Sequence, residues 1–412
     1  MSLKSFLEVN RTAENTKKPA IRFAGFTEDW EQRKFEDVAV RSSTISSESG
    51  FPRVEYEDII SGTGHLNKDI FAKGNDKTGI VFCKGDVLYG KLRPYLQNWL
   101  LPTFNGLAVG DFWVLQPQNT DSSFLYRLIQ SRQFGEVANQ STGTKMPRAD
   151  WKLVSKTEFF IPRTIDEQYA VGTYFANLDN LITLYQCKVD KLTAVKKSML
   201  EKMFPKNGKN IPEIRFKGFT EAWEQRKLGE VASSFEYGLN AAAKEFDGEN
   251  KYIRITDIDD ESHEFKKDDL TSPDTDLSVS DNYRLSDGDI LFARTGASVG
   301  KSYIYKASDG LIYYAGFLIR ARIKAENNPE FVYQNTLTSN YEKFIKVTSM
   351  RSGQPGVNAK EYSQFEFMIP SKAEQDKIAY CFRNLDNLIT LHQRKLEKLK
   401  NIKKSMLEKM FV

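Results

Sequence analysis

The chain contains two copies of one unit, and this duplication limits the architectures open to it. Residues 21–39 read IRFAGFTEDWEQRKFEDVA and residues 214–232 read IRFKGFTEAWEQRKLGEVA, identical at 14 of 19 positions. Residues 178–204 and 385–411 are identical at 20 of 27 positions. These copies are offset by 193 and 207 residues, whereas the repeats of a solenoid recur about every 20 to 50 residues. The sequence therefore predicts two whole domains, each followed by the same element.

Between these segments the two copies hardly resemble each other. Short anchors remain, because Gly85–Tyr89 (GDVLY) matches Gly288–Phe292 (GDILF) and Phe159–Pro162 (FFIP) matches Phe367–Pro370 (FMIP). The offset between matching segments grows along the chain, so the second copy carries insertions in its loops. Near-identical ends around divergent middles indicate two recognition modules that share a scaffold and bind different things.

Each module is followed by a segment with the pattern of a long helix. Apolar residues recur there in steps of three and four, and the only interruption is Gly172 near the start of the first segment. The two stripes consist of Leu178, Ile182, Tyr185, Val189, Leu192, Val195, Met199 and Met203, and of Leu385, Ile389, His392, Leu396, Leu399, Ile402, Met406 and Met410. Such a seam predicts a coiled coil in which each helix packs against the other. The alternative is a surface helix packed on its own domain.

The modules themselves are predicted to be mixed α/β. Short apolar runs at residues 80–82, 87–89, 251–255, 290–292 and 317–323 are typical of strands, and residues 124–130 and 330–347 look helical. The predicted organisation is a polar N-terminal leader at residues 1–20, a first module at 21–165, a connector helix at 166–205, a linker at 206–213, a second module at 214–371 and a second connector helix at 372–412.

Composition and charge exclude several classes of protein. With 412 residues, 40% of them hydrophobic, the chain can bury two or three cores, which excludes a disordered or fibrous protein. No run approaches the ~20 apolar residues of a membrane span, and no apolar signal core is present, so a cytoplasmic protein without a membrane partner is expected. Cys83, Cys187 and Cys381 are too far apart for a disulfide framework or a zinc site. The net charge of +4 leaves a polyanionic partner open.

No catalytic constellation can be assembled from the sequence. Gly296–Ser302 (GASVGKS) resembles a phosphate-binding P-loop, but its glycines are one residue too close, and Thr295 stands where the first glycine is needed. Ser61–Gly64 is a bare GxG motif, and no Pro-Pro-Tyr or Pro-Pro-Phe run occurs that would hold a flipped base. The histidines lie far apart, at His65, His263 and His392. The sequence predicts no catalytic residue, no metal site and no cofactor bound by this chain.

The modules do carry loops rich in residues that bind DNA. In each copy one loop follows the Gly-Asp strand and another precedes the Phe-x-Ile-Pro strand. Arginine forks onto guanine, glutamine and asparagine bind base edges, and lysine or serine holds phosphate. The candidate DNA-binding residues are Lys91, Arg93, Tyr95, Thr144, Lys145 and Arg148 in the first copy and Arg294, Thr295, Ser298, Lys301, Arg351, Gln354 and Asn358 in the second. The alternative for any one of them is a solvated loop side chain, as it is for the basic residues of the connectors.

These motifs together resemble the specificity subunits of type I restriction-modification systems. The resemblance runs from Ile21 to Phe411 and rests on the duplicated IRF-x-GF segment, the GD-[IV]-L strand, the F-x-IP closing segment and the LDNLIT-LEKMF helix. It implies two target recognition domains that each bind half of a bipartite site in double-stranded DNA, with two antiparallel helices as the spacer. The first copy departs from the pattern, since it has Gly90–Tyr95 (GKLRPY) where the second has the GASVGK loop.

The resemblance also implies partners that carry the chemistry. Two modification subunits are expected to bind S-adenosylmethionine and methylate adenine, and restriction subunits are expected to use ATP and Mg²⁺ to translocate and cut DNA. We therefore expect a non-enzymatic DNA-recognition subunit. The alternatives are a coiled-coil scaffold that does not bind DNA, and a stand-alone nuclease or methyltransferase, which the missing motifs disfavour.

Overall fold

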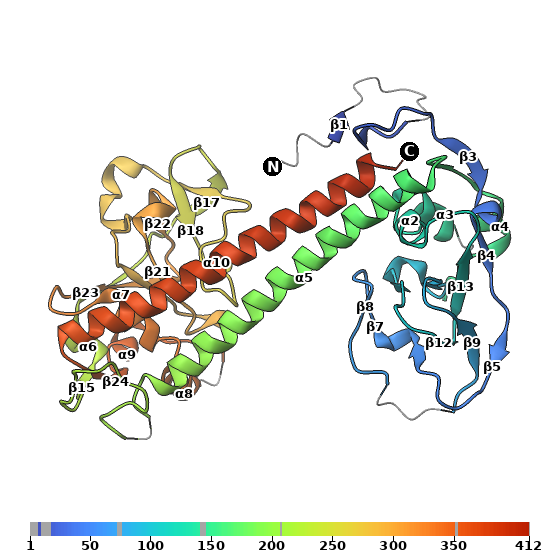
Figure 1. Cartoon of the computed structure of the whole chain (residues 1–412). Helices are drawn as coiled ribbons and strands as arrows, with labels where there is room; N and C mark the ends of the chain where they lie inside the picture. The colour runs from blue at the N-terminus through green and yellow to red at the C-terminus, as the bar shows by residue number, and fades with distance from the viewer. Residues whose placement is uncertain are drawn as a thin grey trace. The chain divides into compact units, whose positions relative to one another are not determined.

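The computed structural model of the chain describes residues 7–9, 18–71, 76–140, 146–206, 208–350 and 353–411. These residues form two compact units (Figure 1). Unit 1 combines the described residues up to Gln186 with those from Gln393 onward, and unit 2 runs from Cys187 to His392. Each unit therefore contains one module and parts of both long helices.

Unit 1 is built around two four-stranded sheets, β11-β10-β13-β4 and β5-β9-β12-β6, with the smaller pairs β1-β2, β14-β3 and β7-β8. Its elements are β1 (Leu7–Val9), β2 (Ile21–Phe23), β3 (Glu31–Lys34), α1 (Phe35–Val38), β4 (Ala39–Arg41), β5 (Ile45–Ser46), β6 (Arg53–Glu55), η2 (Tyr56–Asp58), β7 (Ile59–Ile60), β8 (His65–Leu66), β9 (Gly79–Phe82), β10 (Val87–Gly90), η3 (Pro94–Leu96), β11 (Trp99–Leu100), β12 (Gly106–Val109), β13 (Phe112–Pro117), α2 (Ser122–Leu128), α3 (Arg132–Ala138), α4 (Trp151–Lys156) and β14 (Glu158–Ile161).

Unit 2 is built around the sheet β16-β23-β20-β21, with the pairs β15-β24, β17-β19 and β18-β22. Its elements are β15 (Glu224–Lys227), α6 (Leu228–Val231), β16 (Ala232–Tyr237), β17 (Ala242–Glu245), β18 (Lys251–Ile253), η4 (Ile255–Asp257), β19 (Thr271–Asp274), η5 (Leu277–Val279), η6 (Asp281–Tyr283), β20 (Ile290–Ala293), η7 (Gly296–Ser298), β21 (Ser302–Ile304), η8 (Ala307–Asp309), β22 (Ile312–Tyr314), β23 (Leu318–Ile323), α7 (Pro329–Asn335), α8 (Ser339–Thr348), α9 (Ala359–Tyr362) and β24 (Glu366–Ile369).

The two units share their strand order although their middle sequences have diverged. The order β11-β10-β13-β4 of unit 1 is matched by β21-β20-β23-β16 in unit 2, and both sheets are antiparallel. Each unit also has one parallel pair, β6 with β12 and β18 with β22. The predicted mixed α/β fold is thus confirmed, while the exact bounds of the six predicted segments stay a prediction.

One predicted helix is wrong, because residues 330–347 form two helices, α7 and α8. The break lies at Thr336–Thr338, where two hydroxyls bond to backbone carbonyls of the preceding turn. Thr336 donates to Tyr333 O at 2.6 Å and Thr338 to Asn335 O at 2.7 Å. Such local bonds compete with the helical ladder, and Thr338 then caps the start of α8.

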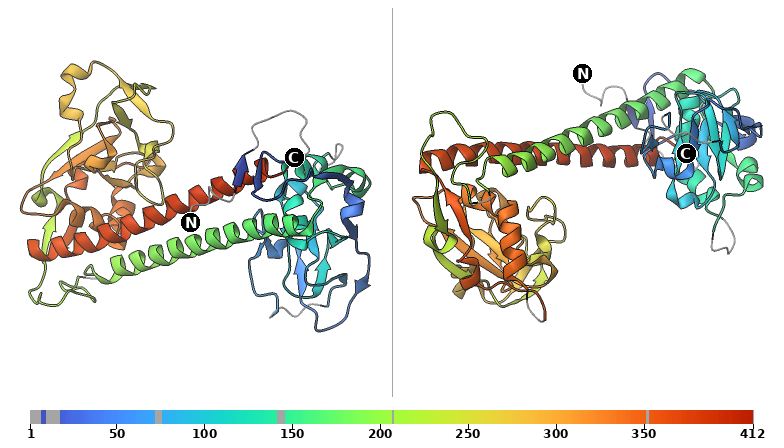
Figure 2. Two further views of the ribbon diagram at one scale, coloured as in Figure 1. Left: turned by 45° about the horizontal axis from the view of Figure 1, so that its top comes forward. Right: turned by 90° about the horizontal axis from the view of Figure 1, so that it is seen from below.

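The long helices α5 (Ile165–Lys202) and α10 (Lys372–Lys409) pack antiparallel within each unit (Figure 2). In unit 1 Asp179 pairs with Lys403 at 2.7 Å, and the Lys395 ammonium lies 5.7 Å from the Tyr185 ring centre. In unit 2 Lys196 pairs with Asp386 at 2.6 Å. The helix pair predicted from the apolar stripes, and its antiparallel direction implied by the family resemblance, are confirmed.

Two residues of α5, Val195 in the first stripe and Gly172 before it, have special surroundings. Val195 is 46% exposed, so its assignment to the seam was wrong; the neighbouring Lys196, whose side chain is only 16% exposed, lies on the packed face instead. Gly172 permits the close approach of α2 to α5, because a Cβ atom at this position would lie 1.8 Å from the Ser123 hydroxyl oxygen. Glycine is therefore required here by packing.

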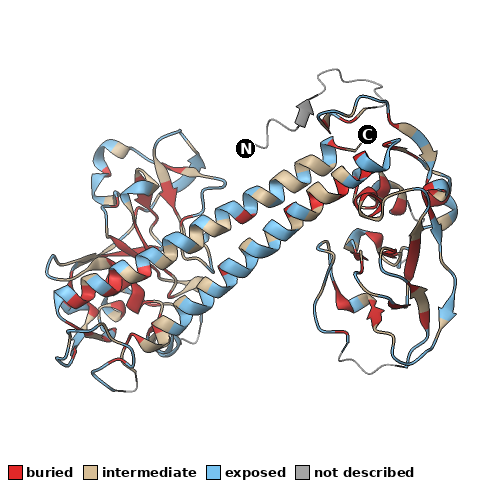
Figure 3. Cartoon of the chain, viewed as in Figure 1, coloured by how far each residue is buried: buried red, intermediate tan, exposed pale blue. Residues whose placement is uncertain are grey.

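The end of each long helix fills the core of the module encoded by the other copy. Phe411 stacks on Phe124 at 5.6 Å and meets Trp30 at 6.4 Å in unit 1. Phe204 stacks on Phe331 at 5.6 Å and meets Trp223 at 6.3 Å in unit 2. Figure 3 shows these helix ends among buried residues. This packing explains why the LEKMF ends and the tryptophan segments are nearly identical in the two copies.

An ion pair with a buried carboxylate fastens the entry segment of each module to the start of its helix. The Arg22 guanidinium donates to both carboxylate oxygens of Glu167, at 2.6 and 2.7 Å. Arg215 makes the same fork to Glu374, at 2.7 and 2.8 Å. Because bidentate pairs between arginine and a carboxylate fix geometry as well as distance, these forks set the direction in which each helix leaves its module.

Candidate nucleic-acid interface

In unit 1 the two predicted loops lie side by side and are joined by backbone hydrogen bonds. Lys91 N donates to Asp111 O at 2.9 Å, Arg93 N to Pro147 O at 2.7 Å, and Ala149 N to Lys91 O at 2.9 Å. Leu92 and Arg148 form an isolated antiparallel bridge. The Tyr56 hydroxyl donates to Leu92 O, and burial raises the pKa of that tyrosine. The loop after β10 is therefore held from both sides.

In unit 2 the corresponding loops are joined in the same way. Arg294 N donates to Phe317 O at 3.1 Å, Gly296 N to Pro355 O at 3.0 Å, and Val357 N to Arg294 O at 2.9 Å. Thr295 and Gly356 form the isolated bridge. Each of the three backbone bonds and the bridge of unit 1 has its counterpart here. Lys91 is therefore equivalent to Arg294, Arg148 to Gly356 and Asp111 to Phe317. We call this set of backbone bonds the loop frame.

The side chains on the loop frame of unit 1 form a small charged cluster. Asp111 accepts from Arg148 at 3.2 and 3.4 Å and lies 3.7 Å from the Lys91 ammonium. Tyr95 is 57% exposed on η3. Arg93 has a positive φ of 47°, and its buried Nε has no hydrogen-bond partner within the part of the chain that the structure describes. Lys91, Arg93, Tyr95 and Arg148 are thus brought together around one turn.

The side chains of unit 2 separate into two kinds. Arg294, Thr295 and Gln354 lie at the loop frame, where the amide nitrogen of Gln354 is close to Gly296, and Ser298 ends η7. Lys301 is different, since only 9% of its side chain is exposed and its ammonium contacts Ile258 O and Asp260. Asn358 caps α9 by accepting from Glu361 N at 2.9 Å. These contacts favour structural roles for Lys301 and Asn358.

Three predicted DNA-binding residues, Thr144, Lys145 and Arg351, lie outside the described residues. They stay predictions from the sequence.

The sequence search missed the aromatic residues beside Arg294. Its guanidinium lies 5.1 Å from the ring centre of Tyr237 and 5.8 Å from that of Phe317. Both rings are exposed, by 45% and 61%. Tyr237 ends β16, and Phe317 occupies the turn between β22 and β23. The sequence gives little sign of their role, because exposed single aromatic residues are common and neither residue is a cation or an amide.

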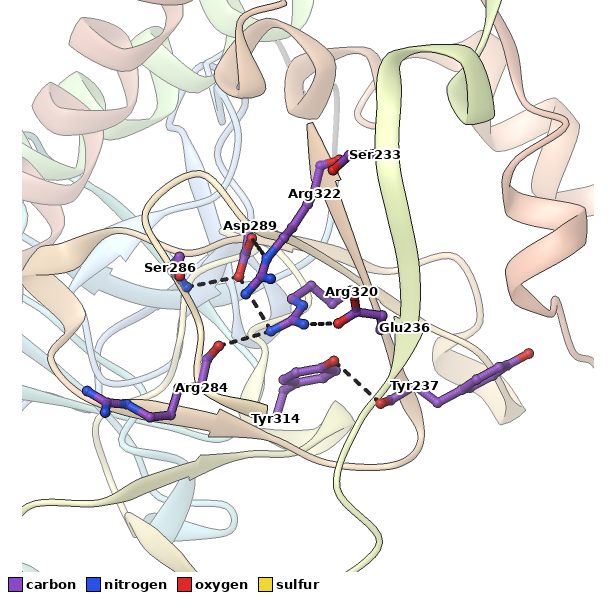
Figure 4. A network of polar contacts seen from close by, with 9 residues as sticks. All are labelled: Ser233, Glu236, Tyr237, Arg284, Ser286, Asp289, Tyr314, Arg320 and Arg322. Carbon is purple, nitrogen blue, oxygen red and sulfur yellow. Dashed lines mark hydrogen bonds and ion pairs between the residues drawn. The ribbon is translucent and has the colours of Figure 1, made fainter. Parts of the chain in front are cut away.

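A buried polar network holds the strand that carries Tyr237 (Figure 4). Arg320, with 1% of its side chain exposed, contacts Glu236 and donates to Arg284 O at 2.9 Å, and it lies 3.8 Å from Asp289. Burial, and then the nearby Arg322, lower the pKa of Arg320 to about 10. Burial also raises the pKa of Asp289, against the opposing effects of Ser286 N and Arg322. The Tyr314 hydroxyl donates to Tyr237 O at 3.4 Å, while the Tyr237 ring points away from the network.

The described residues contain no group of three or more His, Cys, Asp or Glu side chains that could hold a metal ion. In unit 1 His65 lies 3.2 Å from the Thr183 hydroxyl, and in unit 2 the Nδ1 of His263 lies 2.9 Å from Ser302 O. The described helices include none that is long and apolar enough to cross a membrane.

The chain is similar to several known proteins. Residues 220–401 match the family model of the type I restriction modification DNA specificity domain, and unit 1 repeats the strand order of that region. The type I restriction enzyme MjaVIII specificity subunit of Methanocaldococcus jannaschii is 23% identical over 295 residues, which are 70% of this chain and 68% of that protein. Residues 220–401 thus carry a type I restriction modification DNA specificity domain, and the chain as a whole is similar to specificity subunits of type I restriction enzymes.

Two further known proteins are similar to this chain. The type I restriction enzyme EcoDI specificity subunit of Escherichia coli is 25% identical over 186 residues, or 43% of this chain and 41% of that protein. The crystal structure of the S subunit from M. genitalium superimposes with a TM-score of 0.62 at 15% identity, covering 96% of this chain and 99% of that one. This last likeness concerns the fold alone.

Proposed function

We propose that this specificity subunit binds a bipartite sequence in double-stranded DNA and that each module reads one half of it. The observation that supports this proposal is the loop frame. Its backbone hydrogen bonds are the same in both units, whereas the side chains on it differ. A shared backbone with exchanged side chains is what two readers of different sequences require, since base edges are distinguished by hydrogen-bond pattern. The alternative of a coiled-coil scaffold that does not bind DNA gives no reason for this exchange.

The proposed contacts divide according to their surroundings. Lys91, Arg93, Tyr95 and Arg148 serve the first module, and Arg294, Thr295, Ser298 and Gln354 serve the second. Thr144, Lys145 and Arg351 are added from the sequence. Lys301 and Asn358 support the second loop frame from within, because their polar groups are already used by the protein.

The chemistry belongs to partner subunits. The specificity subunit is not an enzyme, and modification subunits supply S-adenosylmethionine and adenine methylation. Restriction subunits supply ATP-dependent, Mg²⁺-dependent translocation and cleavage. This division predicts that the purified chain alone neither methylates nor cuts DNA.

Two modification subunits bind to the two copies of one exposed surface. Several residues are identical in both copies and exposed in both units, although packing does not require them. Two pairs are apolar, Leu181 with Leu388, exposed by 42% and 44%, and Leu184 with Leu391, both exposed by 47%. Polar examples are Thr27 with Thr220, Glu28 with Glu221, and Gln32 with Gln225. Identical exposed residues in otherwise divergent copies favour two copies of the same partner.

The helix pair sets the number of unread base pairs between the half-sites. Inserting seven residues near Val189 and seven near Leu396 preserves the seam and adds about 10 Å at 1.5 Å per residue. With about 3.4 Å per base pair, the spacer should grow by roughly three base pairs while both half-sites stay unchanged. A methylome with the original spacing would contradict this role of the helices.

Reconstitution tests the whole proposal. Gel shifts and methylation assays compare the chain alone, the cognate modification subunit alone, and the two combined. Only the combination should methylate a specific site. Turnover of S-adenosylmethionine by the chain alone would contradict the assignment, and site-specific methylation by the modification subunit alone would leave the chain with no role in recognition.

A further inference from the structure

Residues 111 and 317 occupy the same place on the loop frame and have opposite chemistry. In unit 1 the turn between β12 and β13 presents the Asp111 carboxylate, which binds both nearby cations. In unit 2 the equivalent turn presents the exposed Phe317 ring. Among the described residues no carboxylate forms an ion pair with Arg294, whose side-chain Nη1 donates to Gly316 O at 3.4 Å. The guanidinium therefore keeps its remaining donors for a ligand.

The second ring comes from an extension that unit 1 lacks. Strand β16 continues to Tyr237, whereas its counterpart β4 ends at Arg41. The Tyr237 hydroxyl accepts from Ala359 N at 3.3 Å, which ties the ring to the second loop. Gly238 follows directly and permits the strand to turn, since a Cβ atom there would lie 2.2 Å from Ala315 O. Tyr237, Arg294 and Phe317 thus form one cluster at the surface. Hydrogen bonds to the backbone of Ala359, Gly316 and Phe317 hold it in place.

The chemistry of this cluster fits one kind of dinucleotide. A guanidinium fixed against aromatic rings loses little freedom when it donates to O6 and N7 of guanine. An exposed phenyl ring beside it has no polar partner to offer a base, but it can contact the C5-methyl group of thymine. A carboxylate at the same place would instead draw the guanidinium to itself, as Asp111 draws Arg148.

We propose that Phe317 is a specificity-determining residue of the second module and selects a thymine next to a guanine bound by Arg294. This inference rests on the proposed DNA recognition and names the bases that the second loop frame accepts. Tyr237 acts as a positioning residue. Its ring lies against the Arg294 guanidinium and orients it, but does not itself contact a base.

Uracil substitution provides the test, because uracil lacks only the C5-methyl group of thymine. After the methylome has defined the site, each thymine of the second half-site is replaced in turn by uracil in a synthetic duplex. Methylation by the reconstituted complex should fall about fourfold at one thymine adjacent to a guanine, as expected for losing one buried methyl contact. Phe317→Ala should abolish this discrimination, and Phe317→Leu should retain part of it. Lys217→Ala, an exposed cation outside the loops of the same module, serves as the control and should keep the wild-type discrimination.

The outcomes separate this inference from the proposed function. Wild-type complex that methylates no specific site overturns both. Specific methylation with no thymine beside a guanine in the second half-site overturns the inference alone. So does a Phe317→Ala complex that is folded, as judged by thermal melting, and discriminates thymine from uracil as the wild type does. Loss of discrimination only in the Phe317→Ala complex supports it.

Discussion

At the turn before its central strand the first module carries Asp111, and the second carries Phe317. The backbone bonds around the two residues are the same, pair by pair, although hardly any side chain agrees. The difference shows which part of the module is constant. Strand order and loop frame are retained because packing and backbone hydrogen bonding depend on them, while turn side chains are free to change the ligand. Four predictions test how far this division holds.

The largest effect is expected from the buried ion pairs, which should differ between the modules. Arg22→Met leaves the Glu167 carboxylate buried and should destabilise unit 1 by about 3 to 5 kcal/mol. Arg215→Met should cost unit 2 less, because the Arg215 side chain is 13% exposed and that of Arg22 only 4%. Hydrogen exchange resolved by unit measures both losses. The exposed Arg226→Met is the control, and equal losses would contradict the difference.

A smaller effect is expected at the loop frame. Arg294→Ala should weaken specific binding by about 1 to 3 kcal/mol and relax one position of the second half-site. Lys91→Ala should cost less, because Asp111 already draws its ammonium. Binding isotherms at one fixed salt concentration, together with a methylome, measure both. Lys217→Ala, an exposed cation outside the loops, should change neither. Normal site choice by Arg294→Ala would show that this loop does not bind bases.

Asp111→Ala should change the salt dependence of binding. Removing the carboxylate releases Lys91 and Arg148 toward DNA, so the slope of log K against log salt should steepen by about one. Phe317→Ala removes no charge and should leave this slope unaltered. Titrations at several salt concentrations separate the two. Identical slopes for wild type and Asp111→Ala would mean that this cluster lies away from the phosphates.

The smallest effect concerns pH. Because burial raises the folded-state pKa of Asp289 above its ordinary value of 3.8, the folded state favours the protonated form. The stabilisation of the folded state by protonated Asp289 is fully present below about pH 3.8. It is lost as the pH rises through the raised pKa of Asp289 in the folded state. Asp289→Asn lacks this titration, so the stability difference between wild type and variant should change with pH over that window. Urea unfolding from pH 3 to 7 measures it, and parallel curves would contradict it.

The sequence was sufficient for features that depend on local pattern. The stripes predicted the helix pair, and short apolar runs predicted β10, β20 and β23 within a residue. Val195 was misassigned because Lys196 packs its aliphatic stem on the seam and pairs with Asp386, a contact that periodicity does not reveal. The break between α7 and α8 was missed because it depends on two threonine hydroxyls.

The candidate site was predicted only in part. The four loops were recognised by their arginine, lysine and glycine, yet their pairing depends on hydrogen bonds between residues more than 50 positions apart. Asp111 and Phe317 could not be recognised as equivalent, because the sequences around them do not align. A search for the residue just before each central strand would have found both. Lys301 looked like a phosphate ligand because sequence does not show that its ammonium is already bound.

The packing of Phe411 and Met410 into the core of unit 1 has a consequence for synthesis of the chain. The first module emerges from the ribosome when the residues that close its core have not yet been made. At roughly 5 to 20 residues per second, the ~200 residues still to come take about 10 to 40 seconds. During that interval Trp30 and Phe124 lack their partner Phe411. The core of the first module can therefore be completed only after the second module and α10 have been translated.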